Sequence, residues 1–334
     1  MAIPTPDKFK SVKEVARPCH TFAIARPTAG TIAYVGGSDF KVSEIDLAAA
    51  KPESKDVHAE HTSYVTGLTL AGDALVSGGY DGRLVWWDTK SRQTIRTTNG
   101  AHARWIRKLA ASPDGSQVAS VADDMVCRIW DARTGKLVRE LRGHQEQTPH
   151  GFHSMLYTVA YSPDGKLLAT ADKVGHVVIW DAANGNQLAS VEVPVMYTWD
   201  PVQRLHSIGG VRSVAFSPDS SLLAIGGMGK VGNIDHLEGK SRLEVFDWKA
   251  GKQLCEIQSD KYKGLINRLA FAPNGAWLLG AGGGTEGFIA FWDVKAKKVI
   301  REEKVTTHVH DFALTKSLDS CVLVGHNKVV VFGC

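Results

Sequence analysis

The stretch that decides the fold is residues 112–131, which read SPDGSQVASVADDMVCRIWD. It begins with Ser112-Pro113-Asp114-Gly115, and Pro followed by Asp and Gly is typical of a tight turn between two strands. It ends with Trp130-Asp131 after a short apolar run that predicts a strand. The same arrangement returns at residues 162–181, with the same length from turn to Trp-Asp ending. A repeat of this kind indicates a chain built from copies of one small β unit.

The ending of this stretch recurs along the whole chain as an aromatic or apolar residue followed by Asp or Gly. The seven endings are Ile45-Asp46, Trp87-Asp88, Trp130-Asp131, Trp180-Asp181, Phe246-Asp247, Trp292-Asp293 and Phe332-Gly333. Variants of the turn signal stand at Ser217-Pro218-Asp219-Ser220 and Ala272-Pro273-Asn274-Gly275. Each period has room for four short antiparallel strands, and no stretch shows the 3.6-residue periodicity of an amphipathic helix.

One four-stranded sheet cannot bury both of its faces, whereas seven such sheets packed radially can. The sequence therefore predicts an all-β fold, a seven-bladed β-propeller of four-stranded antiparallel blades. We expect a single domain over residues 1–334, with blades that end near residues 46, 88, 131, 181, 247, 293 and 333.

Composition excludes several other classes of protein. The chain has 334 residues, 43% of them hydrophobic and 22% charged, which is typical of a folded, soluble protein and not of a disordered or collagen-like chain. No run of 18 apolar residues and no apolar N-terminal segment is present, so we expect neither a membrane span nor a secretory signal. The five cysteines are scattered without CxxC spacing, which predicts reduced thiols and a cytoplasmic location.

These repeats resemble the WD-repeat β-propeller family over essentially the whole chain. The resemblance implies a buried, hydrogen-bonded chain of His, Ser or Thr, Asp and Trp within each blade. Two blades match it fully, with His61, Ser77, Asp81 and Trp87 in one and His102, Ser120, Asp124 and Trp130 in the other.

The remaining blades match this pattern less well. The blade that ends at Trp180 keeps His144 and Thr170 but has Val174 where the Asp is expected. His206 stands at about the right distance before the next turn signal to be the structural His of the following blade. Three blades, those ending at Ile45, Phe246 and Phe332, lack the Trp, and we expect apolar packing to stabilise them.

The last period stops at its third strand, so its edge must be covered by another segment. The family closes its ring by donating an N-terminal strand, and residues 9–16 have the position and the β-type alternation for this role. We therefore expect Lys10–Val15 to pair with Val329–Phe332.

Function is expected where the chain departs from its own repeat, because propellers carry their sites on loops. Excess length occurs at Gln145–Ser154, Val193–Gly209, Gly229–Ser241 and Gly282–Glu286. All four inserts join strands whose connections emerge on the same face, over the fourth, fifth and sixth blades. The predicted partner-binding residues are Trp105, His150, Phe152, His153, Tyr197, Trp199, Arg204 and His236. Tyr197 and Trp199 could either anchor a partner or fold back to cover a blade edge.

Several motifs resemble catalytic or cofactor sites without fitting them. The Ser, His and Asp sets fall on structural repeat positions, so no catalytic residue is expected. Gly227–Gly232 and Gly282–Gly287 fit GxGxxG, but no helix follows either of them, and Gly239-Lys240-Ser241 lacks the spacing of a phosphate loop, so no cofactor is expected.

Metal and nucleic acid are not expected as ligands either. His150, His153 and His236 could hold zinc only if two inserts converge, and histidines in polar loops are usually solvated, so no metal is expected. The net charge is only +4, and acidic and basic residues are nearly balanced in the inserts, which does not indicate a phosphate-binding surface.

The resemblance implies a non-catalytic scaffold that presents its elaborated face to a protein or peptide partner. The alternative is an enzyme, since some propellers of other families hydrolyse lactones or esters with a metal in the central channel. A third interpretation is a permanent component of a larger complex or a homo-oligomer.

Overall fold

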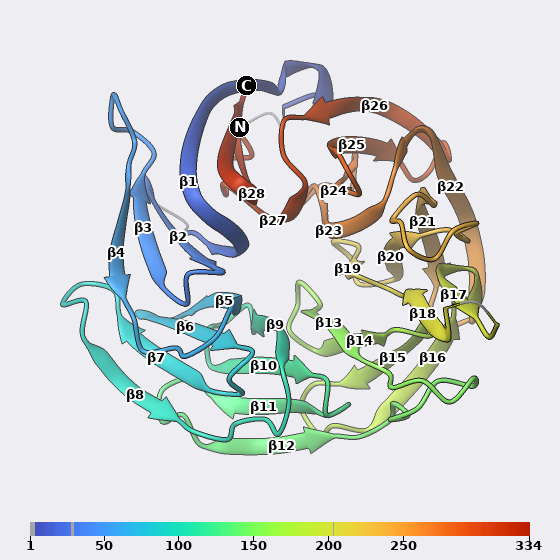
Figure 1. Cartoon of the computed structure of the whole chain (residues 1–334), viewed down its shortest axis with the longest axis horizontal. Helices are drawn as coiled ribbons and strands as arrows, with labels where there is room; N and C mark the ends of the chain where they lie inside the picture. Colours follow the sequence, from blue (N-terminus) through green and yellow to red (C-terminus); the bar gives the residue numbers. More distant parts are fainter. Residues whose placement is uncertain (1–3, 28–29, 203) are drawn as a thin grey trace. The chain divides into compact units, whose positions relative to one another are not determined.

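The computed structural model describes residues 4–27, 30–202 and 204–334. Within them the only helices are two short 3-10 turns, η1 (Pro6–Lys8) and η2 (Pro194–Met196), and all other regular structure is β-strand. The strands of this part form one six-stranded sheet, five four-stranded sheets and one two-stranded hairpin (Figure 1). No helix among these residues is long and apolar enough to cross a membrane. The predicted all-β class with four-stranded antiparallel sheets is confirmed.

The chain divides into two compact units, which are described separately. Unit 1 comprises Met1–Ser120, Arg128–Val138 and Val309–Cys334, and unit 2 comprises Val121–Cys127 and Arg139–His308.

Unit 1 holds the six-stranded sheet, in the order β27-β28-β1-β2-β3-β4, the sheet β5–β8 and most of the sheet β9–β12. The strands of the first sheet are β1 (Lys10–Ala25), β2 (Ile32–Gly37), β3 (Val42–Asp46), β4 (Ser54–His58), β27 (Val309–Leu314) and β28 (Ser320–Gly333). The second sheet consists of β5 (Val65–Ala71), β6 (Ala74–Gly79), β7 (Leu84–Asp88) and β8 (Thr94–Thr98). The third consists of β9 (Ile106–Ala111), β10 (Gln117–Ala122), β11 (Cys127–Asp131) and β12 (Leu137–Leu141).

Unit 2 holds three four-stranded sheets and the hairpin. The first sheet consists of β13 (Leu156–Tyr161), β14 (Leu167–Asp172), β15 (His176–Asp181) and β16 (Gln187–Glu192). The hairpin consists of β17 (Tyr197–Asp200) and β18 (His206–Gly209). The second sheet consists of β19 (Ser213–Phe216), β20 (Leu222–Met228), β21 (Lys240–Asp247) and β22 (Lys252–Lys263), and the third of β23 (Leu265–Phe271), β24 (Leu278–Gly283), β25 (Gly287–Asp293) and β26 (Lys298–Val305).

The repeat markers lie where the sequence predicts them. The seven aromatic or apolar endings stand at the C-terminal ends of β3, β7, β11, β15, β21, β25 and β28. In the turn before β10, the Gly115 amide donates to the Ser112 carbonyl (2.8 Å), and the Ser112 hydroxyl donates to Asp114 (2.6 Å). Gly115 has a φ of 70°, a conformation that a residue with a side chain adopts at a cost.

The N-terminal strand pairs with the C-terminal one, in blue and red in Figure 1. Lys10 lies opposite Gly333 and Val15 opposite Val329, so the pairing expected from the sequence is present. Val15, Val329 and Val331 belong to one buried apolar cluster. Further along, Thr21–Ala25 of β1 pair with β2, and this change of partner joins two repeats into one six-stranded sheet.

In unit 2, the sheets β13–β16 and β19–β22 share one apolar core. Val177 and Ile179 of β15 cluster with Val214 of β19 and Leu223 of β20. Met196 of η2 is buried in the same cluster. This core anchors η2, which leads directly into the hairpin β17–β18.

Candidate partner-binding site

The polar network of the sheet β5–β8 is assembled from the residues that the family resemblance implies. The Nε2 atom of His61 lies 2.7 Å from the Ser77 hydroxyl, which also accepts a hydrogen bond from Trp87 Nε1 (2.8 Å). The Nδ1 atom of His61 lies 3.0 Å from Asp81. Burial alone would raise the pKa of Asp81, but the His61 ring and two backbone amides outweigh it and lower that pKa. Ser77 is therefore engaged inside the sheet and is not a nucleophile beside a free base.

A second network lies around His102 in unit 1. Its Nε2 atom is 2.7 Å from the Ser120 hydroxyl, to which Trp130 Nε1 donates (2.8 Å). The Arg128 guanidinium lies 2.7 Å from His102 Nδ1. Asp124, which the resemblance assigns to this network, accepts a hydrogen bond from the amide of Val126 (3.3 Å).

The third network corrects one expectation. His144 Nε2 lies 2.8 Å from the Thr170 hydroxyl, to which Trp180 donates (2.9 Å), as the pattern implies. The carboxylate is not missing, however, because Asp172 Oδ2 lies 2.8 Å from His144 Nδ1. Asp172 stands two residues before Val174, at the end of β14, and is fully buried.

The four inserts of unit 2, residues 145–154, 193–209, 229–241 and 282–286, are called the crown below; residue 203 lies outside the described residues.

The first insert is a small closed loop. Thr148 donates its amide to the Phe152 carbonyl (2.8 Å), and Ser154 donates to Glu146 (2.8 Å). The loop holds His150 at its outer end, where the side chain is exposed.

The second insert forms the hairpin β17–β18. Tyr197 and Trp199 alternate along β17 and share one face, and Trp199 lies directly opposite Ser207. The His150 ring stacks on this face, with its centroid 3.7 Å from that of Trp199 and 5.7 Å from that of Tyr197. Gly209 at the base has a φ of 100°, and a Cβ there would lie 2.1 Å from the Met196 carbonyl oxygen. The two ends of the hairpin can therefore approach each other this closely only with glycine at this position.

The position of His206 is a second correction. The sequence spacing assigns it to the buried network of the sheet β19–β22, but it lies on β18, opposite Asp200, and is exposed. The repeat spacing fails here because the insert is a hairpin of its own, so distances counted through it do not measure the blade.

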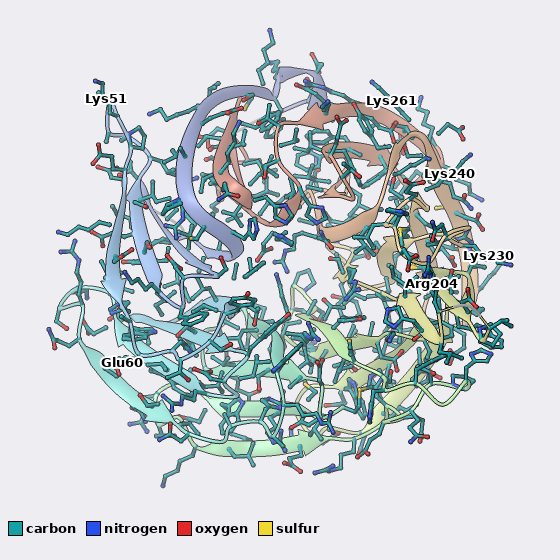
Figure 2. All side chains as sticks on the ribbon, viewed as in Figure 1. Lys51, Glu60, Arg204, Lys230, Lys240 and Lys261 are labelled. Carbon is teal, nitrogen blue, oxygen red and sulfur yellow. The ribbon has the colours of Figure 1, made fainter. Side chains whose placement is uncertain are left out.

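The third insert packs on the other face of the hairpin. The Val231 amide donates to the Thr198 hydroxyl (3.1 Å), and Ile208 packs against a small core that includes Val231. Arg204 forms an ion pair with Asp235 (2.5 Å). Figure 2 shows Arg204, Lys230 and Lys240 on the part of unit 2 that carries β17, β18 and β21.

The fourth insert touches the third. A Cβ on Gly284 would lie 2.5 Å from the Leu237 carbonyl oxygen, so the backbones of the two inserts approach closely. Gly282 and Gly283, expected within the insert, instead end β24. Each insert therefore contacts the next, and the crown is continuous within unit 2.

The crown leaves apolar side chains in solvent at the tip of its hairpin. Val202 is 81% exposed, Leu205 70% and Trp199 39%. Val202 and Leu205 belong to the second insert, but neither is among the partner-binding residues predicted from the sequence. Met196, in the same segment, is buried and faces the core.

The other predicted binding residues are placed as follows. Phe152 is half-buried in the first insert, and the carbonyl of the exposed His153 accepts a hydrogen bond from Lys173 (3.4 Å). The His236 amide donates to the Asn233 carbonyl (3.2 Å). Trp105 lies in unit 1, where its ring stacks on Tyr80. No group of three His, Cys, Asp or Glu residues in the described ranges is arranged to hold a metal ion.

Comparison with known proteins identifies the repeat. The family model described as WD domain, G-beta repeat matches residues 53–88, 92–131, 135–181 and 199–231. The chain is 26% identical over 270 residues to Periodic tryptophan protein 2 of Arabidopsis thaliana, covering 78% of this chain and 27% of the relative. It is 27% identical over 174 residues to the beta subunit of the guanine nucleotide-binding protein of Solanum tuberosum, covering 50% of this chain and 42% of the relative.

A further relative is Protein groucho of Drosophila melanogaster, at 28% identity over 156 residues, which covers 46% of this chain and 20% of the relative. In all three comparisons the chain covers less than half of the relative's own length.

Proposed function

Since this chain contains WD40 repeats of the G-beta type, we propose that it is a non-catalytic scaffold that binds a protein or peptide partner through the crown of unit 2. The observation that carries the proposal is the exposure of Trp199, Val202 and Leu205 on a hairpin held between two other inserts. A rigid support that presents apolar side chains to solvent is the arrangement expected of a binding surface.

The crown combines apolar anchors with a polar rim. The pair Arg204–Asp235 joins the hairpin to the third insert, and Lys240 at the end of the third insert pairs with Asp260 of β22, so charges of both signs accompany the apolar side chains. Interfaces between proteins commonly have this composition, with an apolar centre and polar groups around it. A surface with paired charges is less suited to nucleic acid, which requires an excess of positive charge.

The relatives support a role within an assembly. One of them is named as the beta subunit of a guanine nucleotide-binding protein, and so as one component of a larger protein. By analogy, we propose that this chain is also a component of a larger complex. The scattered cysteines without CxxC spacing are our ground for proposing a cytoplasmic location.

For the scaffold itself, we propose seven blades in one ring. The six-stranded sheet contains the strands of two repeats, so it counts as two blades beside the five four-stranded sheets. In this arrangement the first half of β1 supplies the fourth strand of the last blade, through its pairing with Val329–Gly333.

The test compares the wild type with a Val202→Ser, Leu205→Ser double variant in affinity purification. Both side chains are exposed, so the variant should keep the wild-type melting temperature. A Leu188→Ser variant, which alters an equally apolar and half-exposed residue on β16, is the matched control. We expect the double variant alone to lose a co-purifying partner, and an unchanged set of partners would refute the role of the crown.

A further inference from the structure

A row of aromatic side chains lies on unit 1, outside the crown. The ring centroids of Phe40 and Tyr64 are 5.7 Å apart, those of Tyr64 and Tyr80 are 5.6 Å apart, and those of Tyr80 and Trp105 are 4.4 Å apart. Phe40 precedes β3, Tyr64 precedes β5, Tyr80 follows β6 and Trp105 precedes β9. Connections that are far apart in sequence thus contribute to one continuous surface, called the aromatic row below.

Much of the aromatic row is in contact with solvent. Trp105 is 49% exposed, and Phe40 and Tyr64 are each 39% exposed. Phe40 also has a φ of 69°, a conformation that is unfavourable for a bulky residue. Three aromatic rings of the row are therefore partly open to a ligand.

The row is rigid at its Trp105 end. The rings of Tyr80 and Trp105 are nearly parallel, with an interplanar angle of 4°. The Arg107 guanidinium lies 5.0 Å from the Tyr80 centroid and 5.3 Å from that of Trp105, and it donates a hydrogen bond to the Tyr80 hydroxyl (2.6 Å). A surface fixed in this way loses little conformational entropy when a ligand binds.

Two hydrogen-bond donors stand on the exposed rings, the Tyr64 hydroxyl and the Trp105 indole N–H. Among the described residues, neither donor has a side-chain or backbone acceptor. The row therefore combines apolar ring faces with two hydrogen-bond donors, which is complementary to a ligand that has apolar rings and unpaired carbonyl groups.

We propose that the aromatic row binds a proline-rich segment of a partner in the polyproline II conformation. This helix has no internal hydrogen bonds, so its carbonyls are free to accept from Tyr64 and Trp105. Its proline rings are apolar and pack on aromatic side chains, and its backbone is already ordered before binding. The proposal concerns a surface on unit 1 and does not depend on the crown.

The ring geometry argues against single-stranded nucleic acid as the ligand. Successive bases stack on aromatic faces that are open to them. Here the planes of Phe40 and Tyr64 are tilted by 43° and those of Tyr64 and Tyr80 by 42°, while Trp105 stacks on Tyr80 itself. The row therefore does not present a series of parallel open faces for successive bases, whereas proline rings can pack on single aromatic side chains.

The test is isothermal titration of the full chain with a decaproline peptide, and with a glycine-serine decapeptide of equal length as the control ligand. We expect the wild type to bind decaproline only. Trp105→Ala should weaken this binding about tenfold or more, because it removes the most exposed ring. Tyr64→Phe, which keeps the ring and removes only the donor, should weaken it by a smaller factor of about three.

Trp199→Ala in the crown is the matched control for the loss of an exposed tryptophan, and it should bind decaproline as the wild type does. Equal melting temperatures of all variants would establish that they fold. The proposal is overturned if decaproline does not bind, if Trp105→Ala binds it unchanged, or if Trp199→Ala loses it as well. A dimer in gel filtration that Trp105→Ala abolishes would assign the row to a second copy of the chain and would also overturn it. Loss of binding in Trp199→Ala alone would move the decaproline site to the crown, whereas the other outcomes leave the crown to the separate test with the Val202→Ser, Leu205→Ser variant.

Discussion

Asp172 supplies the buried carboxylate for His144, with its Oδ2 atom 2.8 Å from the imidazole Nδ1. It does so from the end of β14, two residues before the position that holds Asp in the matching repeats. Its other oxygen accepts the amides of Val174 (3.0 Å) and His176 (3.1 Å). One residue therefore both completes the network of its sheet and closes the turn into β15.

Replacing Asp172 should reveal this double role. We expect Asp172→Ala to lower the free energy of unfolding by about 3 kcal/mol, because it leaves His144 and two amides without their acceptor. Val174→Ala, at the position where the repeat pattern expects the Asp, should cost less than about 1 kcal/mol. Urea denaturation of both variants measures the difference, and equal losses would contradict the assignment of Asp172 to the network.

His58 should make stability depend on pH. Burial, assisted by the positive charge of Arg92, lowers the pKa of His58 from 6.5 to about 4. Its ring stacks on Trp87 at a centroid distance of 3.8 Å. In the unfolded chain the His58 imidazole takes up a proton below about pH 6.5, whereas in the folded chain it does so only near pH 4. The contribution of His58 to the free energy of unfolding is therefore complete above pH 6.5 and is lost as the pH falls toward 4.

The magnitude of this loss should be on the order of 2 kcal/mol between pH 7 and pH 4. His58→Phe keeps an aromatic ring against Trp87 and removes the titratable imidazole. Unfolding curves at several pH values should therefore show a shallower pH dependence for the variant. If wild type and variant have the same slope between pH 6.5 and 4, His58 is not held neutral by its surroundings.

The pairing of β1 with β28 predicts that the same substitution at two valines of β1 will differ in its cost to stability. Val15 lies in the apolar cluster with Val329, whereas Val12 is 61% exposed. Val15→Asp should cost about 3 kcal/mol or more, because it buries an unpaired charge, and Val12→Asp should cost less than about 0.5 kcal/mol. Chemical denaturation of the two variants is the measurement, and similar stabilities would rule out a structural role for this pairing.

The stack of His150 on Trp199 predicts that the first insert restrains the hairpin. Aromatic pairs contribute about 0.5–1.5 kcal/mol beyond the area that they bury. We expect His150→Ala to raise amide hydrogen exchange about threefold to tenfold in β17 and β18, with no change in β19–β22. His153→Ala, which removes an exposed ring of the same insert, is the control. Unchanged exchange in the hairpin of His150→Ala would show that the stack does not hold it.

The sequence predicted the strands and their turns because these depend on neighbouring residues. A turn signal such as Ser112-Pro113-Asp114-Gly115 specifies one turn, and an ending such as Trp130-Asp131 marks the end of one strand. Each has the same structural effect in every repeat that contains it. The pairing of Lys10–Val15 with Val329–Phe332 was also predictable, since an open sheet edge is usually covered by another strand, whereas its register was not predicted. The inserts were found for the same reason, as excess length in an otherwise regular spacing.

Two expectations from the sequence are wrong, one because of an insert and one because the carboxylate stands at a different position within a repeat. His206 was assigned by counting residues, and the count fails because the hairpin β17–β18 adds structure of its own. Asp172 was overlooked because two backbone positions can place a carboxylate beside the same imidazole, and spacing alone does not choose between them. The stack of His150 on Trp199 joins inserts about 50 residues apart, for which no local pattern exists.

By itself, the amino-acid sequence determined the β units, their ends and the segments that depart from the repeat, because alternation, turn residues and spacing act over a few residues. Only the tertiary structure decided which carboxylate meets His144, that the crown inserts touch one another, and that Phe40, Tyr64, Tyr80 and Trp105 form one surface. These relationships depend on distances between side chains from separate connections. Such distances are set by how whole sheets pack, and the order of residues along the chain does not record them.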